Sequence, residues 1–338
     1  MSGRSSSGAE WFSKLEPAPQ PEVPAHQPDD PRLSDIVEVW RGDVAALRPG
    51  RAVLIGFPQD EGVRRNHGRP GAAEAPQAIR QWLYRLTTWD ALSESDLASC
   101  PPLDAGNVRI DSDLEATQGA LGEVVAGVLA AGALPIVLGG GHETAFGHYL
   151  GYAALERPVG VINIDAHLDV RPSIGARGHS GSPFRQMLEH PSHPLPGQRY
   201  VCLGAQPYSV SRDHWRYVEE HGGVVRWAAA IGAGLATAFL HERDRLAAAG
   251  CSVYLSIDAD AVRAADVPGV SAPNPTGLAG DEVIACARAA GQSAQVSSLD
   301  LVEINPLFDR DHQSARWAAV VVWNFLMGLA ERSMKDAQ

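Results

Sequence analysis

The chain has 338 residues and a formal net charge of −12 at pH 7. That length suits one large α/β domain or two small ones, and the negative charge disfavours nucleic acid and anionic membranes as partners. The four cysteines show no CxxC pairing, which favours free thiols in a reducing cytoplasm over disulfides. We find neither a signal segment nor an apolar run of about 18 residues, and therefore expect a cytoplasmic protein without a membrane span.

The first 30 residues are rich in serine, proline and charge and poor in aliphatic side chains. This composition predicts a mostly disordered or loosely packed segment over residues 1–30, followed by one domain over residues 31–338. The first predicted strand covers residues 52–57, and the loop at 60–71 that follows it is dense in charge and glycine. Composition alone would make this a solvated loop, but its place after a strand makes it a candidate lip of a binding site.

Two further strands are each followed by potential metal ligands. Apolar residues at helical spacing between 121 and 129 predict a helix, and the apolar run at 134–138 predicts a strand that leads into Gly139-Gly140-Gly141-His142. The run at 159–164 is typical of a strand buried on both faces, and it ends in Asp165, His167 and Asp169. Alternate residues of an extended chain project to the same side, so these three side chains can meet one ligand.

A third apolar run, at 251–257, ends in Asp258 and Asp260. A single aspartate in a loop is more often a turn or cap residue than a ligand, but here several strand ends deliver the same kind of side chain. Open α/β sheets bind ligands beyond the carboxyl ends of their strands. Four carboxylates and two imidazoles are too many for one ion and suit two divalent ions that share carboxylates. The six candidate ligands are His142, Asp165, His167, Asp169, Asp258 and Asp260.

The last predicted strand covers residues 296–304 and ends near Glu303. Two carboxylate oxygens match two N–H donors, so Glu303 is a candidate to bind an amidinium or guanidinium group; a strand-end salt bridge is the alternative. Strands and helices alternate along the chain. This alternation predicts an α/β fold with a doubly wound, mostly parallel sheet of about eight strands.

Four motifs resemble the metal-binding signatures of the arginase–agmatinase (ureohydrolase) superfamily, and they occur in the same order. They are GGGHE at 139–143, DAHLD at 165–169, SIDAD at 256–260 and LVEINP at 301–306. The resemblance covers roughly residues 50 to 330. It implies a three-layer α/β/α fold, a binuclear manganese site, hydrolysis of a C–N bond in a guanidino or amidino group, and a homo-oligomer that is a trimer or hexamer.

The resemblance also implies a role for each candidate ligand. Asp165 and Asp258 would bridge two Mn²⁺ ions, His142 and Asp169 would complete one ion, and His167 and Asp260 would complete the other. Asp169 would in addition be catalytic, by hydrogen bonding to the attacking water. Glu303 would be both catalytic and substrate-binding, by holding the amidinium nitrogen.

Three other stretches are most similar to the family members that cleave N-formimidoyl-L-glutamate to L-glutamate and formamide. These are DEGVRRNHGRPGA at 60–72, GHSGSPFRQ at 178–186 and PGVSAP at 268–273. Arginases and agmatinases usually carry a histidine immediately before the Gly-x-Pro of the second stretch, where this chain has Ser180. Either His179, one residue earlier, replaces that catalytic proton shuttle, or the release of formamide needs less help.

A substrate with a cationic formimidoyl group and two carboxylates needs an anion at one end of its site and cations at the other. Arg171, two residues beyond Asp169, is the first candidate for the carboxylates, and Arg65 and Arg69 are weaker ones. Structural salt bridges are the alternative role for all three arginines. Asn66 and Ser180 are further candidate substrate contacts.

Two other functions stay open. The protein could be a guanidino-compound amidinohydrolase that releases urea, or a metal-binding subunit without turnover. The filled set of six ligand positions argues against the second. A ligand set of oxygen and nitrogen atoms also accepts iron, cobalt or nickel in place of manganese. In each case the expected partner is a small-molecule amidine or guanidine substrate.

Overall fold

A ten-stranded sheet runs through the computed structural model, which describes residues 11–336. The spatial order is β1-β6-β3-β7-β12-β11-β8-β9-β10, with β2 beside β6. Every neighbouring pair is parallel except β1 and β6. In chain order the strands are β1 (Leu15–Glu16), β2 (Glu38–Val39), β3 (Ala52–Gly56), β6 (Leu103–Val108), β7 (Leu134–Leu138), β8 (Val159–Ile164), β9 (Tyr200–Ala205), β10 (Val224–Trp227), β11 (Ser252–Asp258) and β12 (Val296–Val302). A separate hairpin pairs β4 (Trp89–Asp90) with β5 (Ser95–Asp96).

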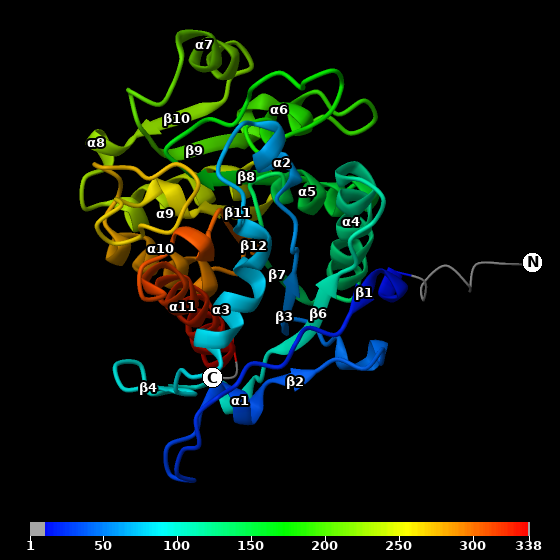
Figure 1. Ribbon diagram of the computed structural model, residues 1–338, viewed down its shortest axis with the longest axis vertical. Helices are drawn as coiled ribbons and strands as arrows, with labels where there is room; N and C mark the ends of the chain where they lie inside the picture. The colour runs from blue at the N-terminus through cyan, green and yellow to red at the C-terminus, as the bar shows by residue number, and fades with distance from the viewer. Residues whose placement is uncertain (1–10, 337–338) are drawn as a thin grey trace, which may run out of the picture.

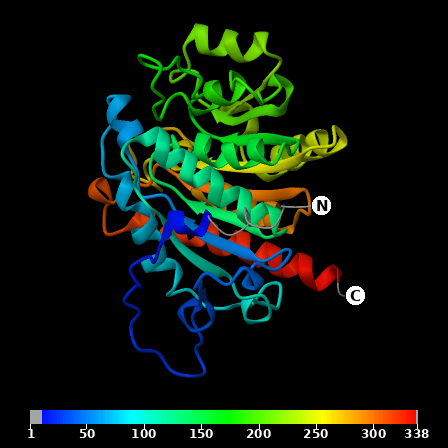
Figure 2. The same ribbon diagram turned by 90° about the vertical axis from the view of Figure 1, so that its right-hand side faces the viewer.

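Helices cover both faces of the sheet, which gives the molecule three layers (Figure 1). One face carries α3 (Ala75–Leu83), α9 (Leu235–Ala248), α10 (Gly280–Gln292) and α11 (Gln313–Asp336). The other carries α4 (Leu114–Ala130), α5 (Thr144–Ala154) and α6 (Pro183–Leu188), and Figure 2 views the sheet from the side of α4 and α5. The remaining α-helices are α1 (Leu33–Ile36), α2 (Glu61–Arg65), α7 (Arg212–Glu220) and α8 (Ala228–Ile231). The buried apolar residues form two clusters, one on each face of the sheet.

The predicted fold class is confirmed. The predicted count of about eight strands matches the eight parallel strands β3 and β6 to β12, and the two additional strands, β1 and β2, have two residues each. Strands β7 and β8 have the predicted bounds because their apolar runs are buried along their whole length.

Strand β6 is longer and more deeply buried than its polar sequence suggests. Its six residues are all buried, including Asp104 and Asn107. The fully buried Arg80 donates to Asp104 from Nε (2.8 Å) and to Asn107 from Nη1 (2.8 Å). A buried polar group needs such a partner, and the partner comes from α3, so the sequence of β6 alone does not reveal it.

Part of the N-terminal segment is packed on the rest of the protein. Residues 1–10 lie outside the described part of the chain, but Trp11 and Leu15 are buried. The ring of Trp11 stacks on Trp40 with 5.1 Å between centroids, and β1 pairs with β6. The absence of a side chain at Gly127 makes room for Trp11, because a Cβ there would lie 2.3 Å from the indole ring. Residues 11–18 are thus packed on the α/β layers because they carry apolar side chains among the polar ones.

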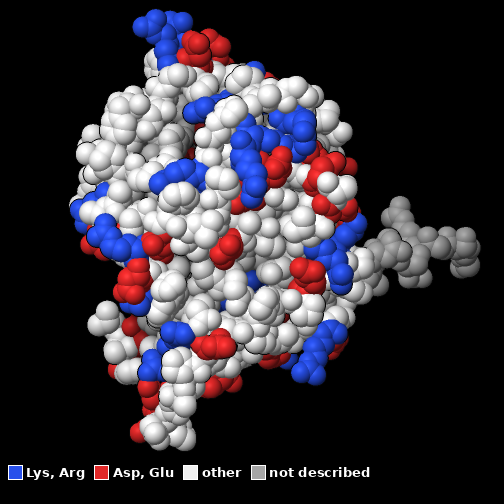
Figure 3. All heavy atoms as spheres, in the orientation of Figure 1, with Lys and Arg blue, Asp and Glu red and all other residues white. Residues whose placement is uncertain are grey.

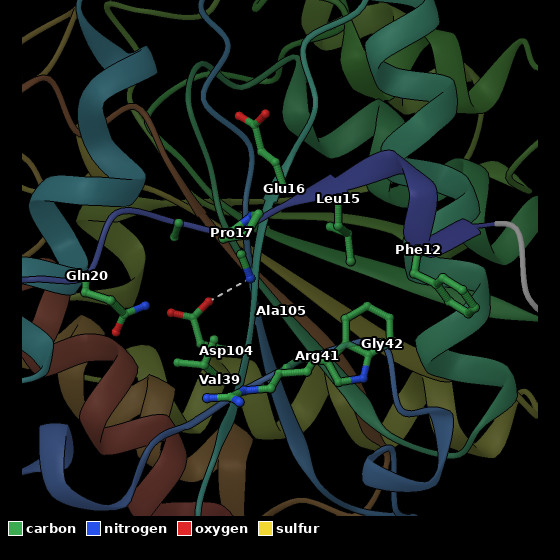
Figure 4. Close-up of a pocket in the computed structure, with 13 residues that line it drawn as sticks. Phe12, Leu15, Glu16, Pro17, Gln20, Val39, Arg41, Gly42, Asp104 and Ala105 are labelled. Atoms are coloured by element: carbon green, nitrogen blue, oxygen red, sulfur yellow. Dashed lines mark hydrogen bonds between the residues drawn. The ribbon is translucent and has the colours of Figure 1, made fainter.

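A hollow of about 220 Å³ lies beneath this segment (Figure 4). Asp104 lies in its wall and accepts a hydrogen bond from the amide of Gly106 (2.9 Å). The other contacts of Asp104 go to Arg80 and to the hydroxyl of Tyr84. Its oxygens therefore have partners within the protein, and the hollow shares no residue with the strand-end cavity described below.

Acidic and basic side chains are interspersed over the face shown in Figure 3. The net charge of −12 is therefore not gathered there into one patch. This face has no extended basic surface of the kind that nucleic acids bind.

Candidate metal centre

The six predicted ligands meet at the carboxyl ends of neighbouring strands. His142 follows β7, Asp258 and Asp260 lie at the end of β11, and the other three follow β8. The chain passes over β12 and β11 between β7 and β8, and such a crossover is where open sheets bind ligands. Gly140 is essential to this turn, because a Cβ there would lie 1.8 Å from the carbonyl oxygen of Gln59.

His142 is the centre of the first group of ligands. Its Nδ1 lies 2.9 Å from Asp169 Oδ2, 2.9 Å from Asp258 Oδ2 and 3.5 Å from Asp165 Oδ2. One ligand atom from each of these four residues lies within 4.8 Å of the others. Nδ1 is buried and has no hydrogen-bond partner. A lone pair aimed at three carboxylates, with no donor between them, suits a cation at this position.

A second group is formed by Asp165, His167 and Asp260, whose ligand atoms also lie within 4.8 Å of one another. His167 Nδ1 lies 3.4 Å from Asp165 Oδ1 and 3.3 Å from Asp260 Oδ2. Asp165 thus offers one oxygen to each group, which is the arrangement of a carboxylate that bridges two ions. Asp258 falls within the first group only. The residues present could hold two divalent ions, and their oxygen and imidazole donors suit manganese.

The electrostatics of the cluster also favour cations. Burial and the neighbouring carboxylates of Asp260 and Asp165 raise the pKa of Asp258 well above its usual range, and burial raises the pKa of Asp260 to about 6. Burial opposes protonation of His142, but Asp169 and Asp258 raise its pKa well above the ordinary value. Bound divalent ions would supply the positive charge that protons otherwise supply to this cluster.

Glu303 lies beside the cluster, and one of its two carboxylate oxygens has no hydrogen-bond partner. Its Oε1 accepts the backbone N–H of His142 (2.9 Å), whereas its Oε2 is buried without a partner. Burial and the charge of Asp258 raise the pKa of Glu303 well above its usual range. Both Glu303 and Asp169 have positive φ angles, 64° and 45°. Such backbone strain at non-glycine residues is concentrated at functional sites.

The cluster opens into a cavity of about 290 Å³, which is close to the small end of the range for ligand sites. Asp169, Asp258, Asp260, His167 and Glu303 form part of its lining. The predicted substrate contacts Asn66, Arg69, Arg171 and Ser180 line the same cavity. The cavity is therefore lined by both acidic and basic side chains.

The candidate substrate contacts differ in how firmly the protein holds them. Asn66 Nδ2 donates to Ser180 Oγ (3.1 Å), which joins the loop after β3 to the loop after β8. Arg69 donates to the carbonyl oxygen of Ser271 (2.9 Å) and lies over the ring of Phe308, so much of its guanidinium is occupied. Arg65 is outside the cavity lining and pairs with Glu61 and Glu115. Arg171 is exposed and lines the cavity.

His179, the candidate proton shuttle, is not among the residues that line the cavity. Its Nδ1 accepts the backbone N–H of Gly181 (3.1 Å) and its Nε2 lies 3.2 Å from the carbonyl oxygen of Pro172. Both ring nitrogens are therefore engaged by the backbone of the loop after β8. The ring lies within the loop because its neighbour Ser180, not His179, faces the cavity.

Sequence reasoning missed three residues at or below this centre. His67 lines the cavity and has a positive φ of 60°. Its place within the NHGR stretch was the only indication in the sequence that it belongs to the site. Ser256 and Asp300 lie beneath His142 and contact each other. Ser256 is the first residue of the SIDAD stretch and Asp300 directly precedes the LVEINP stretch, but each looks like an ordinary polar residue in a buried strand.

Comparison with known proteins decides the family. A profile described as the arginase family matches residues 50–328. The chain belongs to the arginase family. It is 41% identical over 302 residues to the formimidoylglutamase of Chromobacterium violaceum, covering 84% of this chain and 91% of that relative. It is 39% identical over 280 residues to the formimidoylglutamase of Geobacillus thermodenitrificans, covering 82% and 84%.

A solved structure of a relative contains manganese. The crystal structure of Trypanosoma cruzi formiminoglutamase with Mn²⁺₂ matches with a TM-score of 0.82 and 35% identity, over 89% of this chain and 99% of that one. This chain presents two groups of histidine and aspartate side chains that could hold metal ions. None of its helices within the described residues is long and apolar enough to cross a bilayer.

Proposed function

We propose that the protein hydrolyses the formimidoyl C–N bond of N-formimidoyl-L-glutamate, with two Mn²⁺ ions, to give L-glutamate and formamide. The observation that carries this proposal is a cavity that is lined by both Glu303 and Arg171. Its support from relatives is the formimidoylglutamase name of proteins about 40% identical over most of the chain.

The substrate would lie with its formimidoyl group against Glu303. The free Oε2 of Glu303 would accept an N–H of the cationic group, and Arg171 would bind a carboxylate at the mouth. We assign metal binding to His142, Asp165, His167, Asp169, Asp258 and Asp260. When bound, the metal ions supply Lewis acidity, which makes water nucleophilic near neutral pH.

Asp169 is positioned to move the proton. Its Oδ2 lies 2.9 Å from His142 Nδ1, and its carboxylate also lines the cavity. It would accept a proton from the attacking water and deliver it to the leaving amine nitrogen. The C–N bond to glutamate then breaks, and the oxygen of water stays on the carbon as the carbonyl of formamide. His179 would hold the loop after β8 in place and would not transfer a proton.

A substrate panel tests the proposal. Purified, manganese-loaded protein is incubated with N-formimidoyl-L-glutamate, agmatine, L-arginine and a guanidino acid, and glutamate, formamide, urea and ammonia are measured. We expect glutamate and formamide in equal amounts from the first compound. Urea from a guanidino compound, without glutamate release, would instead identify an amidinohydrolase. Two bound metal ions without turnover of any compound would identify a metal-binding subunit.

We further propose that residues 31–338 form one catalytic domain in a cytoplasmic homo-oligomer, a trimer or hexamer as the family resemblance implies. The buried thiols Cys202, Cys251 and Cys286 suit a reducing compartment. The mass of the assembly, measured by light scattering after size-exclusion chromatography, tests the oligomeric state.

A further inference from the structure

A chain of buried polar side chains extends from His142 into the protein, away from the cavity. The ring Nε2 of His142 lies 3.2 Å from Ser256 Oγ, and that hydroxyl donates to Asp300 Oδ1 at 2.6 Å. All three side chains are buried. Ser256 and Asp300 do not line the cavity, so they do not touch a substrate there.

The direction of each hydrogen bond follows from the site. His142 must keep the lone pair on Nδ1 free for an ion, so its proton is on Nε2 and is donated to Ser256. Ser256 uses its own proton for Asp300. The other oxygen of Asp300 accepts from the Tyr254 hydroxyl and lies 3.1 Å from His148 Nδ1. Asp300 is thus the acceptor at which these donors converge.

Strand geometry places these polar side chains in neighbouring rows below the metal centre. Tyr254, Ser256 and Asp258 alternate along β11 and therefore project to one face of the sheet. Ser256 is the register partner of Asp300 on β12, which brings their side chains together. Helix α5 contributes His148 from above this face.

The burial of so many polar atoms needs a reason, because an apolar core would avoid the cost of desolvating them. A hydrogen-bonded network fixes the position of its members, although His148 Nε2 has no partner in this one. The member that reaches the metal centre is His142. Its counterpart His167 has a side chain that is 25% exposed and lies outside this network.

We propose that Asp300, acting through Ser256, is a positioning residue that fixes the ring of His142 for one of the two metal ions. This inference rests on the two-metal site of the proposed function, and it goes further by assigning the network to one ion only. Partners of metal-bound histidines typically change metal affinity by about 10–100-fold when they are removed.

Ser256→Ala is the direct test. Equilibrium titration of the metal-free protein with Mn²⁺, followed by the electron paramagnetic resonance of free Mn²⁺, measures both binding constants. We expect one constant to weaken by about 10–100-fold and the other to stay as in the wild type. At limiting Mn²⁺ the variant should then hold one ion where the wild type holds two. Ser256→Thr, which keeps the hydroxyl, should restore the second ion.

Ser298→Ala is the matched control, because Ser298 is a buried serine on β12 whose hydroxyl contacts Tyr152 and not His142. It should lower the unfolding temperature without changing either constant. Asp300→Asn, the second variant, should reproduce the one-ion loss of Ser256→Ala. If Ser256→Ala leaves both Mn²⁺ binding constants unchanged, or weakens both equally, the proposal is wrong. If Asp300→Asn does not fold, the titration of Ser256→Ala decides alone.

The outcomes also separate this inference from the proposed function. Wild-type protein that binds two Mn²⁺ ions but releases no glutamate would contradict only the proposed function, and the titrations would still decide the role of Asp300. Wild-type protein that binds fewer than two ions per chain would contradict both.

Discussion

At the scale of single residues, Glu303 and Arg171 are proposed to bind the two ends of the substrate, its formimidoyl group and a carboxylate. Glu303 is held by the strained backbone after β12 and by the N–H of His142. Arg171 is exposed and lies at the edge of the same cavity. A fixed anion at one end and a cation at the other recognise a molecule by both its charge pattern and its length.

Glu303→Gln should reduce catalysis and leave the metal content unchanged. The variant keeps the size of the side chain but removes the charge that would pair with the formimidoyl cation. Loss of one partner of a buried charge pair costs about 2–5 kcal/mol, so kcat/KM should fall by about 30-fold or more. Steady-state kinetics and metal analysis of the same preparation check this. Loss of bound metal in this variant would show that Glu303 is a ligand.

Arg171→Ala should act mainly on KM. A hydrogen bond to a charged group contributes about 1.5–3 kcal/mol, so KM for N-formimidoyl-L-glutamate should rise by about 10–100-fold with a smaller change in kcat. Arg177→Ala is the control, because Arg177 is exposed in the same loop but does not line the cavity. Equal effects of the two substitutions would point to the net charge of the loop and not to a contact from Arg171.

The metal centre could be predicted from the sequence because each ligand can be recognised from the few residues around it. Each candidate ligand follows an apolar run directly, and alternate spacing fixes the side to which Asp165, His167 and Asp169 project. For His179 the sequence alone could not decide which of two neighbours lines the cavity, because a one-residue difference from Ser180 determines this. The contact between Ser256 and His142 could not be predicted either, since the two residues are distant in sequence and meet only through the sheet.

At the scale of elements, the loop after β8 carries two of the candidate substrate contacts, Arg171 and Ser180. Residues 171–177 are exposed, whereas residues 178–180 are buried against the protein. His179 ties the two arms of this loop together through Pro172 and Gly181. The positions of Arg171 and Ser180 therefore depend on the protonation state of the His179 imidazole.

Acid should loosen this loop. Burial lowers the pKa of His179 below its ordinary value of 6.5, with Asp169 opposing and Arg171 and Arg65 assisting the shift. The ordered loop binds a proton less readily than the open loop, so the stability that His179 gives is present above pH 6.5 and is lost as pH falls below it. A proton on Nδ1 would also face the N–H of Gly181, two donors with no acceptor between them.

Hydrogen exchange measures this effect. We expect amides of residues 171–182 to lose protection between pH 7 and pH 5.5 relative to their intrinsic exchange rates, while amides of β8 keep theirs. In His179→Asn, whose side-chain oxygen can still accept from Gly181 but cannot be protonated in this range, the pH dependence should be reduced. An equally steep pH dependence in this variant would assign the change to another group.

At the scale of the whole molecule, the sequence predicted the layers but not the way in which the chain closes one edge of the sheet. Apolar runs and helical spacing are enough to predict alternating strands and helices, and the order β7-β12-β11-β8 then follows only from packing. The polar composition of the first 30 residues concealed Trp11 and Leu15, which are too few to form a core but sufficient to join one. Composition averages over a segment, whereas burial is decided residue by residue.

Trp11→Ala should test whether this N-terminal segment stabilises the fold. Trp11 is 9% exposed, packs beside Gly127 of α4 and stacks on Trp40. Replacement of a buried tryptophan by alanine costs about 3–5 kcal/mol, so denaturant unfolding of the metal-free variant should show a clear loss of free energy. Metal content and kcat/KM should not change, because no residue of this segment lines the cavity.

Trp89→Ala provides the matched control, since Trp89 undergoes the same truncation from a position that is 48% exposed. Exposed substitutions usually change stability by less than about 0.5 kcal/mol. If Trp11→Ala were no more harmful than Trp89→Ala, the contacts of residues 11–18 would contribute nothing to folding, and the composition-based expectation of a loose segment would hold in solution. A large difference would mean that β6 gains its outer neighbour β1 through the anchoring of one tryptophan, and that the sheet depends on it.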